Sequence, residues 1–227
     1  MTAWRHWLII IYFGFAVCVS SSEVPVNKPR DLKPANLISS TFAKIEKNGL
    51  PAGWKVTVRG ENARFAGVTV ERDKKPSQNV VRIQLRKEAG VCLDTAGPAQ
   101  LVAGKRYLLV VQFKVDDMFF TGHWYHRPAG IWIYVYGTNN KHTWMAVRGE
   151  GDTEGWVTAL LPFPPVNRKE DAGDFSRTNV ILHCYNMVGT VRFRTPMIIE
   201  IPKGFDMEAQ FELKGASVYG GNLTLKP

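Results

Sequence analysis

The chain has 227 residues, and its 29 Lys and Arg against 20 Asp and Glu give a formal net charge of +9. Its 45% hydrophobic content is enough for one packed domain, and its longest apolar run, Leu8–Val17, falls short of the roughly 20 residues that a bilayer span needs. The basic residues are scattered and follow no recognition motif, which excludes nucleic acid and favours polyanionic partners such as acidic polymers or anionic surfaces.

The N-terminus predicts export. Arg5, the apolar run and small residues at Ser20–Ser22 indicate a signal peptide over residues 1–22. Cys18 offers the alternative of a lipoprotein signal, although Val17 is a poor fit to the small residue expected there. Residues 23–35 contain three prolines among basic residues and are typical of an extended tether. We therefore expect one domain over residues 36–227 in a secreted, periplasmic or cell-surface protein without a transmembrane segment.

The rest of the chain predicts strands throughout, because no 3.6-residue apolar period persists for three turns. Short segments rich in Val, Thr and aromatic residues alternate with Gly, Pro and Asn. They are Trp54–Val58, Arg64–Glu71, Val80–Lys87, Lys105–Val115, Gly130–Thr138, Thr143–Arg148, Trp156–Phe163, Thr178–Tyr185, Thr190–Ile201, Met207–Leu213 and Ala216–Tyr219. Long connections at residues 116–129 and 164–176 favour a jelly roll over a meander, so the predicted fold is an all-β, antiparallel β-sandwich of jelly-roll type.

Two segments carry basic residues on one strand face. Arg82 and Arg86 alternate with aliphatic residues, and Arg192 and Arg194 do so in a later strand. Guanidinium groups suit carboxylate and sulfate. The alternative is that these residues only keep a solvent face soluble.

The segment Gly130–Gly137 alternates strictly. Ile131, Ile133 and Val135 point to one side of the predicted strand, and Trp132, Tyr134 and Tyr136 to the other. A row of rings on a rigid sheet suits flat, partly apolar ligands such as sugars. The alternative is that a loop or a partner buries the strand on both faces.

Neighbouring segments could extend such a site. Trp124 and Tyr125 could form a wall beside the aromatic strand, and Trp144 could join its rings or enter the core. The polar turn Asn139–His142 could bind sugar hydroxyls or be a plain hairpin turn.

Two cysteines, Cys92 and Cys184, remain after export. An even count in an oxidising compartment permits a disulfide, and two buried free thiols in neighbouring strands are the alternative.

Three groups of residues have side chains of the types used in catalysis or metal binding. Glu150, Asp152 and Glu154 alternate like glycosidase carboxylates, but the glycines among them indicate a loop. His123 and His126 lack further metal ligands nearby, and Tyr125 with His126 and Arg127 resembles a lyase set only superficially. No catalytic residue and no metal ligand is therefore predicted.

The motifs of the chain resemble those of jelly-roll carbohydrate-binding modules with a galactose-binding-like fold. The opening segments Asn36-Leu37-Ile38, Thr41-Phe42 and Gly49–Trp54 are similar to the start of those modules. Later similarities are Val102–Tyr107, the strand from Gly155-Trp156 to Phe163, and the closing segment Phe211–Val218.

The resemblance implies core positions for Trp54, Tyr107 and Trp156. It also implies a structural calcium site, but Phe42 is followed by Ala43 where the family often has Glu. Glu46 or Asp206 could contribute instead, yet no cofactor is predicted.

The sequence thus predicts a secreted, non-catalytic protein that stacks the rings of an oligo- or polysaccharide on Trp132, Tyr134 and Tyr136. The polymer could be acidic if Arg82 and Arg86 line the same groove. The alternative is a structural or adhesive module with an envelope protein partner, and a polysaccharide lyase or glycosidase is a lesser one.

Overall fold

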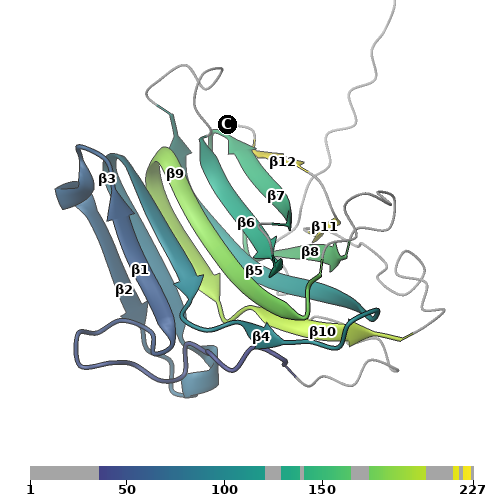
Figure 1. The fold of residues 1–227 in the computed structure, drawn as a ribbon. Helices are drawn as coiled ribbons and strands as arrows, with labels where there is room; N and C mark the ends of the chain where they lie inside the picture. Colours follow the sequence, from purple (N-terminus) through teal and green to yellow (C-terminus); the bar gives the residue numbers. More distant parts are fainter. Residues whose placement is uncertain are drawn as a thin grey trace, which may run out of the picture.

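The computed structural model describes residues 36–120, 129–138, 141–164, 174–202, 217–219 and 222–225. Within these ranges the chain is built of strands and two single-turn 3₁₀-helices, Ala63–Phe65 and Pro76–Gln78 (Figure 1). The strands are β1 Trp54–Arg59, β2 Ala66–Glu71, β3 Val80–Thr95, β4 Ala99–Gln100, β5 Arg106–Phe119, β6 Gly130–Tyr136, β7 His142–Gly149, β8 Val157–Phe163, β9 Arg177–Arg194, β10 Met197–Ile201, β11 Ser217–Tyr219 and β12 Asn222–Leu225. None of the described helices is long or apolar enough to cross a membrane.

Strands β3 and β9 organise the fold. They have 16 and 18 residues and pair with each other in antiparallel fashion. The register of the pair shifts between Leu85 and Gly90, and such irregularities bend a strand and increase its twist. Both β3 and β9 therefore contribute one half to a first layer and the other half to a second layer.

The first layer has the strand order β12-β7-β6-β9-β3-β1, with the N-terminal half of β9 and the C-terminal half of β3. The second layer has the order β11-β8-β5-β9-β3-β2, with the other halves of β9 and β3, and β10 pairs with β5. Figure 1 is viewed toward the outer face of the first layer, with β1 at the left and β7 at the right.

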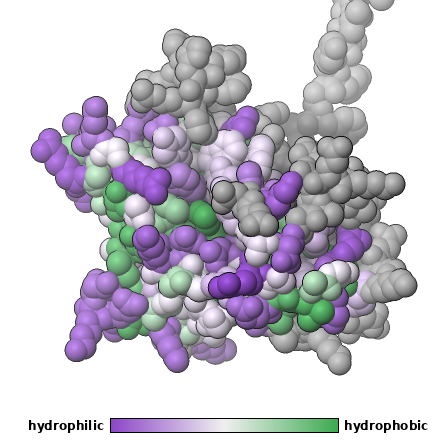
Figure 2. All heavy atoms as spheres, in the orientation of Figure 1, coloured by the Kyte–Doolittle hydropathy of each residue, from purple (hydrophilic) through white to green (hydrophobic). Residues whose placement is uncertain are grey.

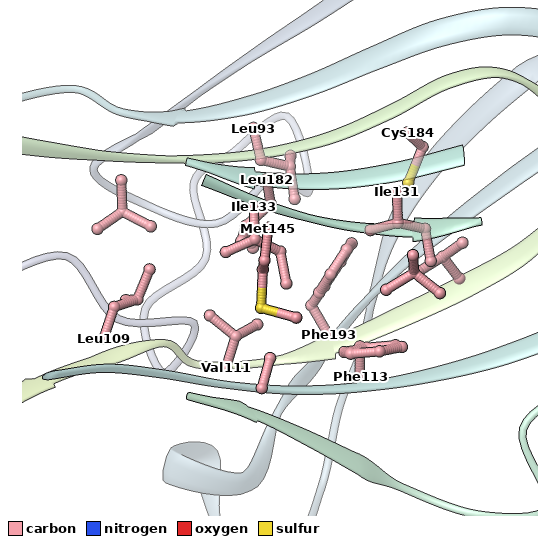
Figure 3. Close-up of a cluster of buried hydrophobic side chains, with 14 of the residues drawn as sticks. Leu93, Leu109, Val111, Phe113, Ile131, Ile133, Met145, Leu182, Cys184 and Phe193 are labelled. Carbon is pink, nitrogen blue, oxygen red and sulfur yellow. The ribbon is translucent and has the colours of Figure 1, made fainter. Parts of the chain in front are cut away.

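The core lies between the two layers, because alternate residues of each strand point inward. Figure 3 shows Leu93, Leu182, Ile133 and Met145 of the first layer facing Leu109, Val111, Phe113 and Phe193 of the second. These side chains are fully buried. The opposite faces of both layers are consequently the outer surfaces of the molecule.

Two of the three aromatic residues predicted for the core are confirmed there. Trp54 is buried and its indole N–H donates to the Ser40 carbonyl at 3.3 Å. Tyr107 is buried, and its hydroxyl accepts from the Val102 N–H at 2.8 Å. Trp156 is only half-buried, and the Arg194 guanidinium lies 4.3 Å from the centre of its ring.

The predicted fold, an all-β antiparallel sandwich of jelly-roll type, is confirmed. Among the described strands, β11 and β12 depart from it, because they pair in parallel with β8 and β7. Strand β3 continues to Thr95, past the predicted end at Lys87, and β9 is unbroken where two strands were predicted. The predicted signal peptide, the predicted tether and the predicted strand Met207–Leu213 all lie outside the described residues.

Candidate functional site: an aromatic face on the first layer

Strand β6 presents its rings on the outer face of the first layer. Ile131, Ile133 and Val135 are fully buried in the core. Trp132, Tyr134 and Tyr136 point the other way, as the alternation predicts. Gly130 begins the strand with φ +103°, and a Cβ there would lie 2.3 Å from the Val147 carbonyl oxygen. Glycine is therefore required where the aromatic strand begins beside β7.

Strand β7 adds two more rings to this surface. Trp144 pairs with Tyr134, and His142 pairs with Tyr136. The Trp132 and Trp144 rings are 4.9 Å apart and the Tyr136 and His142 rings are also 4.9 Å apart. Of the two alternatives left open for Trp144, it joins the aromatic row and does not enter the core. We call these five side chains the aromatic face.

The five rings are not equally accessible. Trp132 is only 8% exposed, because it lies between Trp144 and Tyr134, and the Arg148 guanidinium sits 5.0 Å from its ring centre. Tyr134 and Tyr136 are half-buried, and Trp144 is 40% exposed. Trp132 thus supports the surface, and Trp144 and His142 are its exposed rings. Figure 2 shows this side of the molecule, with a pale surface over β6 and β7 and, at the left over β1 and β2, hydrophilic residues with hydrophobic ones between them.

Strands β9 and β3 continue the same surface with polar groups. His183 lies opposite both Trp132 and Cys92, and Asn179 lies opposite Tyr136. Asp94 pairs with Ile181, the residue that faces Tyr134.

Four buried polar atoms on this surface have no hydrogen-bond partner within the described part of the chain: Trp132 Nε1, Asn179 Oδ1, His183 Nε2 and Asp94 Oδ1. An unsatisfied buried polar atom costs roughly 1–3 kcal/mol. Such atoms are uncommon in native proteins and need an explanation, of which a missing ligand or ion is one. Because these four atoms are inaccessible to solvent, a ligand would reach them only after the atoms around them move.

Burial keeps the Tyr134 phenol, the Cys92 thiol and the His183 imidazole of this surface uncharged near pH 7. It raises the pKa of Tyr134 to about 12 and that of Cys92 to about 11. It also raises the pKa of Asp94, although Lys55 opposes that effect. Burial, helped by the positive charge of Arg59, lowers the pKa of His183 to about 4. The phenol and thiol are therefore protonated and the imidazole is neutral.

Cys92 and His183 face each other without the properties of a nucleophilic pair. An activated thiol has a lowered pKa, and that of Cys92 is raised.

Arg82 and Arg86 lie on the outer face of the second layer, which contradicts the idea that they line a groove with the aromatic strand. The half of β3 that contains them pairs with β2, on the far side of the bend. Arg82 Nε is 3.7 Å from Glu71. Arg192 contacts Glu71 and Asp116, so its charge is already paired.

Cys92 and Cys184 are free thiols, so the alternative of a disulfide is wrong. In the β3–β9 pair, Cys184 is opposite Val91 and Cys92 is opposite His183. Cys184 therefore points into the core and Cys92 points outward, and the sheet separates the two sulfur atoms.

The acidic segment after β7 braces the end of β5. Asp152 accepts a hydrogen bond from the Asp117 N–H, and Thr153 accepts one from the Val115 N–H at 2.9 Å. Glu150 accepts a longer one from Phe120. Glu150 and Asp152 thus make hydrogen bonds that stabilise the local structure, and the segment is a loop, as its glycines predict.

Several predicted residues lie outside the described ranges: Trp124, Tyr125, His123, His126, Asn139, Asn140 and Asp206. Glu46 is described and accepts a long hydrogen bond from the Asn48 side chain at 3.5 Å. Among the described residues, no group of three or more His, Cys, Asp or Glu side chains could hold a metal ion.

Some residues of the surface were missed by the sequence analysis. His183, Asn179 and Tyr185 alternate with Val180, Leu182 and Cys184 in a segment correctly predicted as a strand. That alternation was a usable signal. Lys55 and Arg59 of β1 could not be found this way, because their position depends on the register of β1 with β3.

Comparison of the sequence with models of known families finds no match, and no curated protein matches it. Among solved structures, the enzymatically active domain of tailspike protein 4 from bacteriophage CBA120 is similar, with a TM-score of 0.47 and 11% identity over 72% of this chain. The chain spans only 22% of that structure's length.

Carbohydrate-binding modules recur among the similar structures. TmCBM61 in complex with β-1,4-galactotriose has a TM-score of 0.41 and 13% identity, over 75% of this chain and 97% of the module. The CBM22-1 xylan-binding domain from Paenibacillus barcinonensis Xyn10C has a TM-score of 0.40 and 14% identity, over 74% of this chain and 96% of the domain.

Proposed function

We propose that this protein binds glycans without cleaving them, by stacking sugar rings on the aromatic face. The observation that carries this proposal is the exposed Trp144 ring, held 4.9 Å from the buried Trp132 ring. A ring that its neighbours already hold in place loses little side-chain entropy when a ligand covers it. Its apolar face complements the C–H face of a sugar.

The polar atoms around the rings support the same function. The Trp132 indole N–H is a donor, the Asn179 and Asp94 oxygens are acceptors, and the His183 imidazole can be either. Sugar hydroxyls both donate and accept, so they match this mixed set.

Two observations support a non-catalytic role. The Tyr134 phenol, the Cys92 thiol and the His183 imidazole are neutral near pH 7, with the pKa of His183 at about 4 and that of Cys92 at about 11. Acid–base catalysis favours groups with a pKa close to the working pH. Glu150 and Asp152 have structural hydrogen bonds at the end of β5.

We propose further that the protein acts outside the cytoplasm, on the strength of the signal-like residues 1–22. Cell fractionation with N-terminal sequencing of the mature chain tests this. Recovery of an uncleaved chain from the cytoplasm would contradict it.

The binding test compares Trp144→Ala with a matched control, Trp156→Ala. Trp156 is a half-buried Trp that stacks with Arg194 and lies away from the aromatic face. Affinity electrophoresis against a panel of neutral and acidic polysaccharides gives the readout. We expect at least one polymer to retard the wild-type protein, and Trp144→Ala to weaken that binding at least about tenfold, or about 1.4 kcal/mol.

Trp156→Ala should keep the wild-type affinity. Equal binding by wild type and Trp144→Ala, or no retardation by any polymer, would overturn the proposal. A turnover assay on the same polymers separates binding from lyase or glycosidase activity.

A structural or adhesive role is the second candidate, because an exposed Trp beside half-buried tyrosines could equally be covered by a protein partner. Sedimentation analysis distinguishes the two. Self-association that Trp144→Ala abolishes, together with no glycan binding, would favour this second role.

A further inference from the structure

We propose that β1, β3 and β9 form a second subsite on the outer face of the first layer, which binds an anionic sugar unit of the same oligosaccharide. Tyr185 provides its ring platform, and Arg59 with Lys55 provides its positive charge. The anionic group is a carboxylate or a sulfate. This inference rests on the proposed glycan-binding function and specifies its substrate class.

The Tyr185 ring packs closely against β3 because Gly90 has no side chain. The two residues are paired across β9 and β3, and a Cβ on Gly90 would lie 3.1 Å from Tyr185 Cδ2 and 3.4 Å from Cε2. The same Cβ would lie 3.8 Å from the Cβ of Arg59. Gly90 therefore lets the Tyr185 ring lie next to the Arg59 side chain.

A neighbouring ring holds Tyr185 from its other side. The His183 and Tyr185 rings are 5.0 Å apart at 61°, an edge-to-face contact. His183 itself pairs with Trp132. The Tyr185 platform is thus continuous with the aromatic face through His183.

The positive charges at this end of the surface are unpaired. Arg59 and Lys55 are exposed, and neither forms an ion pair or hydrogen bond within the described part of the chain. Both point to the same side of β1, because they are four residues apart in a strand. In contrast, Arg192 on the second layer has two carboxylates as partners.

An acid that faces one of these two cations is Asp94, which pairs with Lys55 across β1 and β3. Burial raises its pKa, so the surroundings disfavour its negative charge. The positive charge of Lys55 acts on the same carboxyl in the opposite direction and offsets part of its negative charge.

The spacing of the strands fits one oligosaccharide over both subsites. Four strand steps separate β7 from β1, through β6, β9 and β3. At about 4.8 Å per step this is roughly 19 Å across the strands, and the row of paired residues that begins at Trp144 ends at Lys55. Arg59 lies four residues further along β1, so Trp144 and Arg59 are roughly 23 Å apart, enough for about four to five sugar units. Such a ligand would stack one end on Trp144 and place an anionic unit near Arg59.

Arginine is suited to this task. Its planar guanidinium makes two parallel hydrogen bonds with a carboxylate or a sulfate. Because Arg59 is exposed, salt screens the interaction, and we expect it to matter most at low ionic strength.

The experiment uses the full mature chain and pairs of polymers that differ only in charge. Polygalacturonate and its methyl ester test the carboxylate, and a sulfated galactan and its desulfated form test the sulfate. The variants are Arg59→Gln, Lys55→Gln and the control Arg86→Gln. Arg86 is equally an exposed arginine on an outer strand face, but it lies on the second layer.

We expect the wild-type protein to prefer at least one charged polymer over its neutral partner at low salt, and to lose this preference at high salt. Arg59→Gln should weaken binding of that charged polymer by about fivefold, with the neutral partner unaffected, and Lys55→Gln by about twofold. Arg86→Gln should leave both affinities unchanged. The pair that shows the preference identifies the anion.

Two different results would overturn the subsite. One is binding of charged and neutral partners with equal affinity, and the other is an equal effect of Arg59→Gln and Arg86→Gln. In both cases a loss of binding in Trp144→Ala would leave the proposed function intact. If no polymer of either kind binds the wild-type protein, the glycan-binding function fails with the subsite.

Discussion

The residues of the aromatic face divide into supporting and contacting groups. Trp132 is covered by its neighbours, whereas Trp144 faces solvent. Replacing Trp132 by Ala would leave a cavity, which typically costs about 3–5 kcal/mol for a buried aromatic residue. Replacing Trp144 removes a ligand contact at a smaller cost in stability. Trp144 is therefore the residue at which binding can be tested without unfolding the protein.

His183 makes the stability of the protein depend on pH. Its pKa is about 4 in the folded protein, because burial and Arg59 disfavour the imidazolium, against an ordinary value of 6.5. The unfolded chain therefore takes up the proton first as the pH falls. The stability contributed by the neutral imidazole is fully present above about pH 6.5, and it is lost between there and about pH 4.

The expected result is a difference between wild type and His183→Gln. On going from about pH 7 to about pH 4.5, wild type should lose about 2 kcal/mol more of its free energy of unfolding than the variant loses. Urea denaturation at the two pH values measures this. Asp94, whose raised pKa acts in the opposite direction, is present in both proteins and cancels. Equal losses in the two proteins would show that His183 titrates normally in the native state.

At the scale of the elements, Gly130 sets where the aromatic strand begins. Its φ of +103° and the 2.3 Å approach of a Cβ to the Val147 carbonyl leave no room for a side chain. Gly130→Ala should lower the free energy of unfolding by at least about 2 kcal/mol. Chemical denaturation measures the change.

Gly67→Ala in β2 is the matched control, because a Cβ there meets nothing within 4 Å. It should change stability by no more than about 0.5 kcal/mol. Similar stabilities for the two variants would contradict the close contact at Gly130.

The elements also show what could be predicted from the sequence. The strict alternation of β6 predicted its buried and outer faces, and the outer rings lie as expected. The length of β3 was missed because Lys87-Glu88-Ala89-Gly90 has the composition of a turn, whereas in the structure it contains a shift of register within one strand.

The errors in the predicted site have one physical cause: the sequence of a single segment does not show which strands it pairs with. Which face a residue lies on depends on its own strand, and this was read correctly for Arg82 and Arg86. Which layer that part of the strand belongs to depends on the strands it pairs with, and the local sequence pattern does not identify those strands. The same reason explains Cys92 and Cys184, which lie in neighbouring strands but on opposite faces.

At the scale of the whole molecule, the two layers share strands and cannot unfold separately. Strands β3 and β9 contribute one half to each layer, and the main core is a single cluster that spans both. We expect a single cooperative unfolding transition. Far-ultraviolet circular dichroism, which reports strands, and near-ultraviolet circular dichroism, which reports the rings, should give the same midpoint in urea. Two separate midpoints would mean that the layers are independent units.

The close packing of Trp132 against Trp144, at 4.9 Å and 48°, has an optical consequence. Two indole transitions so near each other and not parallel couple as excitons, which splits their circular dichroism band into lobes of opposite sign. Any molecule that moves Trp144 must change this splitting. The protein thus contains its own label-free spectroscopic reporter, located where we expect the first sugar to bind.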